Sequence, residues 1–560
     1  MNTVNQVSAV SHHESWHGIN WYKCHRVVKK LQLRIAKASK EGQWRKAKSL
    51  QRMLTRSFAG KAVAIKRVTE NTGKRTPGVD KQIWSTSEAK WNAIAQLGRK
   101  GYKPLPLRRV YIPKANGNKR PLGIPTMKDR AMQALYLLAL EPISEVNADH
   151  NSYGFRPVRS TADAIEQIFR NCSMSYSAKW ILEGDIKGCF DNINHEWLLN
   201  NIPMDKQVLN KWLRAGYLDK GVFHTTAAGT PQGGIISPVL ANMTLDGLEK
   251  ELRQKFGKKK SEFSKKNKVN YVRYADDFII TGISREILVN EVKPLVVSFM
   301  QQRGLELSNE KTVITNIDDG FDFLGQNVRK FNGKLIIKPS RRNLKNVLKK
   351  IRYIIDSNKM ATSWRLIALL NPIIRGWANY HKHVVSKETY SYVDAQIWRK
   401  LWRWCVRRHP KKNKRWIRRK YFRSSGMRNW IFFGIDPTGK EYELLRADSI
   451  PIVRHTKVKA EANPYEIRWE SYFEKRQDEL WIKSQRNKRK IAAIWYRQNQ
   501  VCPMCGQRFS NETGWHVHHK IRKLMGGGDE IDNLILLHPN CHRQLHANEA
   551  GFFNKKLIKA

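Results

Sequence analysis

The chain alternates between two hydrophobic patterns, one typical of amphipathic helices and one typical of short strands. Residues 21 to 70 carry apolar side chains at helical intervals with Lys and Arg between them, and this spacing predicts a basic helical region. The apolar positions that set the period are Trp21, Val27, Val28, Leu31 and Ile35. A second basic helical pattern begins after residue 339 and contains many aromatic residues.

Strand-like runs occupy much of the chain between these two helical regions. Residues 108–114 and 119–125 flank a turn at residues 115–118, and the Asn-Gly pair in that turn predicts a β-hairpin. Residues 126–140 then show helical spacing. The hairpin has basic residues at both ends, so it is suited to contact phosphates.

A second predicted hairpin contains two adjacent carboxylates, Asp276 and Asp277, between the apolar halves of the run from Tyr271 to Ile280. Neighbouring acids repel each other, whereas Mg²⁺ binds carboxylate oxygens together with substrate phosphates. The pattern therefore indicates a metal site at the turn. Considered alone, the same pair also fits an ordinary solvated turn.

A third carboxylate, Asp185, directly follows the apolar run Trp180 to Gly184, which predicts a strand that ends at the acid. Three acids on two strands are suited to hold two metal ions about 3.5–4 Å apart, as phosphoryl transfer requires. Residues 229–242 form a glycine-bearing loop that opens a helix, and glycine permits close approach of the backbone to a base pair.

The charge of the chain identifies its class of partner. Lys and Arg number 103 against 48 acidic residues, a formal net charge of +55, and such an excess attracts nucleic acid or an anionic membrane. No apolar run reaches the roughly 18 residues of a membrane span, and the first twenty residues lack a secretory pattern. The sequence predicts a nucleic-acid partner, no membrane, and binding that weakens steeply with salt.

Three of the seven cysteines lie close together near the C-terminus. Cys502 and Cys505 have the same separation as His538 and Cys541, and paired N/S ligands at this spacing predict a closed structural Zn²⁺ site. Clustered cysteines of this kind indicate metal binding in a reducing compartment and not a disulfide framework.

The polymerase-like motifs, taken in chain order, resemble those of the reverse transcriptases encoded by group II introns. The matching segments are residues 108–130, 153–164, 185–191, 229–242, 274–277, 304–312 and 321–325. The resemblance implies a right-hand polymerase whose fingers and palm combine an antiparallel sheet with helices. It also implies that Asp185, Asp276 and Asp277 hold two catalytic Mg²⁺ ions, with help from the carbonyl of Ile186.

The same resemblance assigns the nucleotide-binding residues. Lys114 and Arg120 correspond to residues that clamp the triphosphate, and Gln232 lies where the family contacts the nascent base pair. Phe190 corresponds to the steric gate that excludes a ribose 2′-OH, and Lys311 to the lysine that protonates the departing pyrophosphate. Core packing for Phe190 and a simple surface charge for Lys311 remain open alternatives.

The C-terminal segment around the predicted zinc site resembles an HNH endonuclease of the ββα-metal type. By this resemblance His519 is the general base, and Asn533 orients its ring. His518 and His542 hold one divalent ion, with His546 as an alternative to His542. The family often has Cys where His538 stands, so the fourth zinc ligand is open, and a zinc ribbon that only binds DNA is the competing interpretation.

The sequence therefore predicts a multidomain α+β protein. Residues 375–381 resemble the thumb and maturase region of the same intron-encoded family, although an ordinary helical thumb also fits them. The predicted parts are a basic helical N-terminal extension (1–60), reverse transcriptase fingers and palm (61–330), an α-helical thumb and maturase domain (331–440), a DNA-binding segment (441–490) and a small zinc-containing HNH domain (491–560).

The resemblance implies a mobile-element protein that binds structured intron RNA as a ribonucleoprotein and assists splicing. Its HNH domain is expected to nick double-stranded target DNA, and its polymerase to extend the freed 3′-OH with dNTPs during retrohoming. The expected location is the bacterial cytoplasm, with the nucleoid, or an organelle. The alternatives are a reverse transcriptase of another element, a splicing-only maturase with a decayed polymerase, and a stand-alone homing nuclease.

Overall fold

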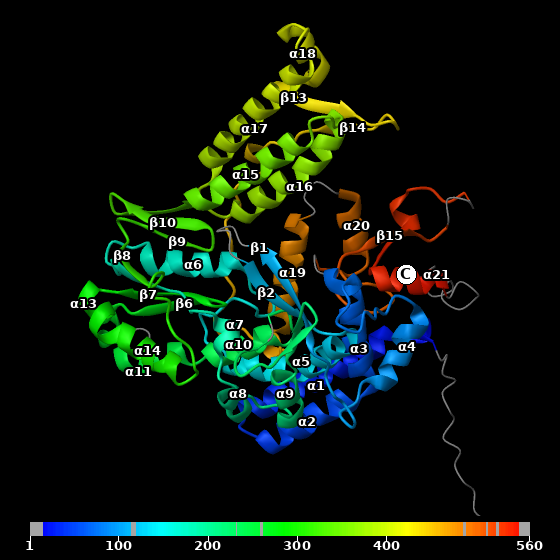
Figure 1. Cartoon of the computed structure of the whole chain (residues 1–560). Coiled ribbons are helices and arrows are strands. Elements are labelled where there is room, and N and C mark those ends of the chain that lie inside the picture. Colours follow the sequence, from blue (N-terminus) through cyan, green and yellow to red (C-terminus); the bar gives the residue numbers. More distant parts are fainter. Residues whose placement is uncertain are drawn as a thin grey trace, which may run out of the picture.

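A computed structural model gives the fold. It describes residues 15–113, 119–230, 232–257, 261–484, 489–510, 513–521 and 526–547. Figure 1 shows a broad lower body of helices and strands, from which a long helical bundle rises at the top, while the C-terminal elements lie beside the first helices of the chain. In the described residues, no helix combines the length and apolar character that crossing a membrane requires.

The N-terminal helices pack against the long buried helix α5, which forms the centre of the lower body (Figure 1). Trp21, Cys24, Val28, Leu31 and Ile35 of α1 are buried, as the 3.6-residue period demands. Val27 is exposed, so the prediction that it lies on the apolar face of α1 is wrong. The helical spacing places Cys24 on that face instead. The bounds are α1 (Trp21–Lys40), α2 (Trp44–Arg56), α3 (Phe58–Glu70), α4 (Ser87–Gln96) and α5 (Met127–Asn147).

A four-stranded antiparallel sheet in the order β6-β7-β3-β8 carries the predicted acids. Its side chains alternate between two cores: Leu182 and Ile280 face the core shared with the N-terminal helices, whereas Ile181 and Ile279 face a second core. Both faces are therefore buried, and only the strand ends are available for chemistry. The strands are β3 (Trp180–Gly184), β6 (Asn270–Tyr274), β7 (Asp277–Gly282) and β8 (Val313–Asn316).

The predicted basic hairpin is confirmed as β1 paired antiparallel with β2, in a second sheet of order β2-β1-β4-β5. Its turn, including Lys114, lies outside the described residues. The strands are β1 (Leu107–Pro113), β2 (Lys119–Ile124), β4 (Tyr217–Asp219) and β5 (Val222–His224). The helices near the two sheets are α6 (Thr161–Cys172), α7 (Cys189–Asn192), α8 (His195–Asn201), α9 (Lys206–Leu213), α10 (Ser237–Leu245), α11 (Leu248–Phe256) and α14 (Lys293–Gln301).

The bundle at the top of Figure 1 has its own hydrophobic core, separate from the core of the lower body. It follows a three-stranded sheet of β9 (Phe321–Phe323), β10 (Gln326–Phe331) and β11 (Lys334–Pro339). Its elements are α15 (Arg341–Ser357), α16 (Ser363–His381), α17 (Lys387–Arg408), α18 (Lys414–Tyr421), β12 (Phe422–Ser425), β13 (Arg428–Ile435) and β14 (Glu441–Glu443).

The chain after the bundle returns to the lower body and packs on it. The Asp163 carboxylate lies 2.9 Å from the His455 ring and 2.9 Å from the Arg476 guanidinium, and Arg159 donates to the Ala462 carbonyl at 2.9 Å. This segment is thus joined to the lower body by buried polar contacts. The last elements are α19 (Glu470–Ser484), α20 (Arg489–Arg497), β15 (His516–His519), β16 (Leu534–Leu537) and α21 (Pro539–Ala547).

The C-terminal elements dock on the start of the chain. The Gln544 side-chain amide donates to the carbonyls of His17 and Ile19 at 2.6 and 2.9 Å, and Arg543 lies 3.4 Å from Glu70. Cys502, Cys505 and Cys541 belong to the same hydrophobic cluster as the N-terminal helices. The two ends of the described chain therefore share one core.

Candidate functional sites

The strand register brings the three predicted acids to one edge of the sheet. Tyr274 pairs with Asp277 across the hairpin turn, and Gly184 pairs with Phe278 on the neighbouring strands. Because β3 and β7 run antiparallel, Asp185 follows Gly184 toward the position opposite Asp277. The three carboxylates therefore lie at the same end of two neighbouring strands.

Buried side chains support the turn that carries Asp276. Ala275 has a left-handed backbone (φ 58°), and its carbonyl accepts from Arg273 at 3.3 Å. Asn242 accepts from the same guanidinium at 3.0 Å and donates to the Gly154 carbonyl at 2.8 Å. A Cβ on Gly154 would lie 2.2 Å from the Ala275 amide nitrogen, so only glycine fits there.

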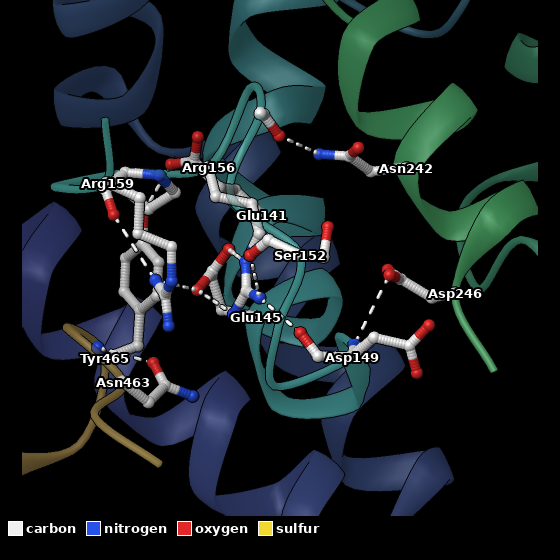
Figure 2. Close-up of polar contacts among 12 residues, drawn as sticks. Glu141, Glu145, Asp149, Ser152, Arg156, Arg159, Asn242, Asp246, Asn463 and Tyr465 are labelled. Carbon is white, nitrogen blue, oxygen red and sulfur yellow. Dashed lines mark hydrogen bonds and ion pairs between the residues drawn. The ribbon is translucent and has the colours of Figure 1, made fainter. Parts of the chain in front are cut away.

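Figure 2 shows how the loop that contains this glycine is anchored. Arg156 donates to both oxygens of Glu145 at 2.8 and 2.9 Å and to the Asp149 carbonyl at 2.7 Å. The Asp149 amide donates to Asp246 at 3.3 Å, and Asp246 also pairs with Arg273. Removing one member of a buried ion pair typically lowers the free energy of unfolding by about 3–5 kcal/mol. These pairs therefore hold the residues that support the turn firmly in place.

We expect Asn242→Ala to weaken metal-dependent polymerase chemistry without unfolding the protein. The substitution removes the hydrogen bonds of Asn242 to Gly154 and to Arg273, the residues that support the turn, and so frees the Asp276 carboxylate to shift. Small misplacements at a reacting centre cost about 10- to 100-fold in rate. Primer extension titrated with Mg²⁺ measures the effect, and the half-maximal Mg²⁺ concentration should rise. Asn201→Ala, an equal truncation at the end of α8, should change neither value; equal losses in the two variants would contradict the positioning role.

The pKa of Asp277 is raised to about 6. Loss of hydration is the largest cause, followed by the negative charges of Asp276 and Asp185, whereas Lys311 acts in the opposite direction. Repulsion among three carboxylates is the condition that a bound cation relieves. The electrostatics of this strand edge therefore favour divalent metal binding.

The raised pKa also predicts how stability changes with pH. The usual pKa of this carboxyl is 3.8, so the metal-free folded state binds its proton more tightly than the unfolded state does. Stability then falls as pH rises from about 4 to about 6 and stays lower above that range. In Mg²⁺-free buffer at neutral pH, Asp277→Asn should raise Tm by about 1–2 °C after allowance for solvent screening. Scanning calorimetry measures this; a lower Tm would contradict the assigned repulsion.

The other predicted polymerase residues surround the acidic edge. Lys311 Nζ lies 2.9 Å from Asp185 Oδ2, and this hydrogen bond raises the pKa of Lys311. Ile186 is buried and forms a β-bridge with Leu307. Phe190 is half-buried, with its ring edge-on to Phe155 at a centroid distance of 6.1 Å.

Two elements meet at the glycine-bearing loop. Gln232 accepts from the Gly123 amide through its backbone at 2.7 Å, and its side chain donates to Asp191 at 3.1 Å. Arg120 is exposed on β2, opposite Ile112. The loop is thus tied to both the basic hairpin and the segment that follows Asp185. Of the residues predicted for the polymerase site, Lys311 therefore contacts Asp185 and Gln232 contacts Asp191, whereas Arg120 lies on the hairpin strand β2.

The predicted zinc ligands form one cluster. Ligand atoms of Cys502, Cys505, His538 and Cys541 all lie within 4.8 Å of one another, and all four residues are buried. Cys505 Sγ is 3.2 Å from His538 Nδ1. Three thiols and one imidazole that converge in this way fit a tetrahedral structural ion, and the set includes His538, whose place as the fourth ligand was open.

A second cluster consists of His518, His542 and His546, whose ligand nitrogens also lie within 4.8 Å of one another. His518 comes from β15, and the other two occupy successive turns of α21. The sequence left His542 and His546 as alternatives, whereas the structure brings both to His518. Three partly exposed imidazoles suit a metal ion that keeps one coordination position open.

The expected general base has a different partner from the one inferred by resemblance. His519 Nε2 lies 2.7 Å from an Asp529 carboxylate oxygen. In the described part of the chain, the side chain of Asn533 hydrogen-bonds to the backbone of Ile521 and Gly528 and not to the His519 ring. Asn533 therefore fixes the loop beside His519, and the expectation that it orients the ring is wrong. Asp529 is the residue that contacts the His519 ring.

The upper bundle presents a basic and aromatic surface. Trp398 and Trp402 stack with centroids 6.0 Å apart and an interplanar angle of 5°, and Trp430 lies edge-on to both. Arg418 lies over the Trp430 ring at 4.6 Å. Cations interleaved with aromatic rings are suited to phosphates and bases. The same stretch of the chain carries the cations Arg407, Arg408, Lys414, Arg415, Arg418, Arg419 and Lys420.

Sequence reasoning missed the residues that position these sites. Arg273 stands inside an apolar strand and Asn242 inside an apolar helix, and a polar side chain at such a place signals a buried hydrogen bond. That signal was available in the sequence. Asp529 and His516 gave no comparable signal, because their contacts depend on how β15 meets the following loop and α21.

Comparison with known families matches four segments of the chain. Residues 16–97 match the "N-terminal domain of reverse transcriptase", and residues 112–328 match "Reverse transcriptase (RNA-dependent DNA polymerase)". Residues 344–422 match the "Group II intron, maturase-specific domain", and residues 502–548 match "HNH endonuclease". Reverse transcriptases and HNH endonucleases are metal-dependent, and maturase domains bind RNA.

Curated relatives agree with these matches. The chain is 34% identical over 409 residues to "Group II intron-encoded protein LtrA" of Lactococcus lactis subsp. cremoris, covering 57% of this chain and 68% of that protein. It is 34% identical over 319 residues to "Protein YkfC" of Escherichia coli K12, covering 50% and 81%. An "Uncharacterized 91 kDa protein in cob intron" of Schizosaccharomyces pombe is 28% identical, covering 59% and 50%. The chain belongs to the group II intron-encoded proteins, as a reverse transcriptase and maturase with a C-terminal HNH endonuclease domain.

Proposed function

We propose that Asp185, Asp276 and Asp277 hold two Mg²⁺ ions and use them to join dNTPs to a DNA 3′-OH on an RNA template. The ions supply charge stabilisation for the attacking and leaving oxygens. The Ile186 carbonyl supports the same site, and Lys311, already 2.9 Å from Asp185, donates a proton to pyrophosphate. The observation that carries this proposal is the shared strand edge of the three carboxylates, together with the raised pKa of Asp277.

The surrounding residues select and hold the nucleotide in this proposal. Lys114 and Arg120 of the basic hairpin contact the triphosphate, and Gln232 lies against the nascent base pair. Phe190 excludes the ribose 2′-OH; its ring is half-buried and lies edge-on to Phe155.

The HNH domain is proposed to cut DNA with one divalent ion held by His518, His542 and His546. His519 removes a proton from the attacking water, with its ring held by Asp529, and Asn533 fixes the adjacent loop. Zn²⁺ on Cys502, Cys505, His538 and Cys541 is structural, because that cluster is buried whereas the histidines are accessible. A zinc ribbon without nuclease chemistry does not require the second cluster.

The proposed partners are structured intron RNA and double-stranded target DNA. The basic, tryptophan-rich bundle binds the RNA, and residues 441–490 contribute to DNA binding. The predicted domain limits, near residues 60, 330, 440 and 490, belong to the same proposal. The ribonucleoprotein promotes splicing, nicks its target and copies the intron from the freed 3′-OH, in a bacterial cell or an organelle, where its DNA and RNA lie.

Reconstitution with the intron RNA that encloses the gene tests the assembled function. The ribonucleoprotein should insert into a target duplex, nick the opposite strand, and extend that nicked end with intron-templated DNA. Retention of primer extension on generic templates, without splicing assistance or target nicking by the cognate complex, would favour a reverse transcriptase of another element.

A further inference from the structure

A fourth histidine lies beside the proposed endonuclease ion site. His516 and His518 are two residues apart on β15, so their side chains share one face of the strand. That face meets α21, where His542 and His546 are one turn apart. The His516 ring is nearly perpendicular to that of His542 (84°), with centroids 5.1 Å apart. His516 is outside the three-histidine cluster but in contact with its central member.

The two ring nitrogens of His542 face different partners. Its Nε2 lies 3.2 Å from His546 Nε2, and its Nδ1 lies 3.4 Å from His516 Nδ1. Two imidazole nitrogens that bind one ion at about 2.0–2.1 Å with tetrahedral geometry stand about 3.3–3.4 Å apart. The Nε2 pair therefore has nearly the spacing that a shared ion requires, and the third histidine of the cluster lies on the same side.

This arrangement fixes which nitrogen of His542 carries the proton. If Nε2 binds the ion, Nδ1 must hold the hydrogen, because a neutral imidazole has one N–H nitrogen and one nitrogen with a free lone pair. Metal-bound histidines generally donate that second N–H to an acceptor, which sets the tautomer and the ring orientation. The acceptor facing His542 Nδ1 is His516 Nδ1.

We propose that His516 is a positioning residue for the endonuclease metal ion. Its Nδ1 accepts the Nδ1 hydrogen of His542 and so turns the Nε2 lone pair of His542 toward the ion. His516 itself, an exposed residue, then carries its proton on Nε2. This inference rests on the proposed three-histidine ion site.

Nickel binding to the full-length, zinc-loaded chain tests the proposal, because imidazole ligands suit Ni²⁺. An Asp276→Asn, Asp277→Asn background removes competition from the polymerase carboxylates. In isothermal titration calorimetry, His516→Leu should weaken Ni²⁺ binding by about 10- to 100-fold, the usual effect of losing an outer partner. His516→Asn should keep the Ni²⁺ affinity close to that of the parent, because its amide oxygen branches from Cγ as Nδ1 does and accepts the same hydrogen.

Matched variants separate this role from its alternatives. Val517→Ala changes the opposite face of β15 and should leave Ni²⁺ affinity unchanged. Unchanged affinity in His516→Leu, or equal losses in the Leu, Asn and Val517→Ala variants, would overturn the positioning role. His518→Ala and His542→Ala should abolish the same binding event. If they do not, the ion site itself is wrong, and the role of His516 fails with it.

Discussion

Replacing Asp277 with asparagine should reduce RNA-templated primer extension by at least about 1,000-fold. The carboxylate is one of three ligands proposed for the two ions, and an amide of the same size removes its charge without removing its volume. Loss of several kcal/mol of transition-state stabilisation lowers the rate about tenfold for each 1.4 kcal/mol. The measurement is single-turnover incorporation of one dNTP on an annealed RNA template with saturating Mg²⁺.

Two controls make the result specific. Asp318→Asn, on an exposed loop after β8, should extend primers at the normal rate. The Asp277 variant should still nick DNA, because the HNH site lies on other elements. Normal primer extension by Asp277→Asn would remove this carboxylate from the proposed metal site.

His519→Ala should reduce nicking of target DNA by about 100- to 10,000-fold, the usual contribution of a general base. The substitution leaves both the three-histidine cluster and the cysteine cluster intact, so metal content should stay constant. Nicking of a labelled duplex by the ribonucleoprotein, with metal content measured on the same sample, gives the comparison. Asp529→Asn should cause a smaller loss, because it weakens the hold on the ring without removing the base.

Val517→Ala is the matched control, since Val517 shares the face of β15 with His519 and lies outside both metal clusters. It should nick at the normal rate. Primer extension should be normal in all three variants. A His519→Ala protein that nicks as fast as its parent would show that another group activates the water.

The polymerase edge was predictable from sequence because its pattern is local. Two short apolar runs and a two-residue turn set the hairpin that carries Asp276, and the pairing of Tyr274 with Asp277 follows from that short turn. The meeting of Asp185 with that hairpin was expected from the chemistry of two-metal catalysis and from the family resemblance, since strand pairing across about 90 residues is not encoded in either segment. The support by Arg273, Asn242 and Gly154 was not predicted, because it depends on three elements that converge only in the folded chain.

The metal-binding C-terminus shows the same limit. The spacing of Cys502 and Cys505 predicted half of a zinc site. His538 and Cys541, which have the same separation, predicted the other half. Nothing in the sequence decided between His542 and His546. The two residues are one helical turn apart on α21, and both lie close to His518. The docking of this domain on the N-terminal helices also escaped prediction, since the contact from Gln544 goes to backbone carbonyls that any sequence provides.

Anomalous scattering from Mn²⁺ tests the central claim most directly. Crystals of the protein with an RNA template, a DNA primer and a non-reactive dNTP analogue should show two manganese peaks about 3.5–4 Å apart, bounded by Asp185, Asp276 and Asp277. A structure with primer and nucleotide in place but no manganese between these carboxylates would contradict the account.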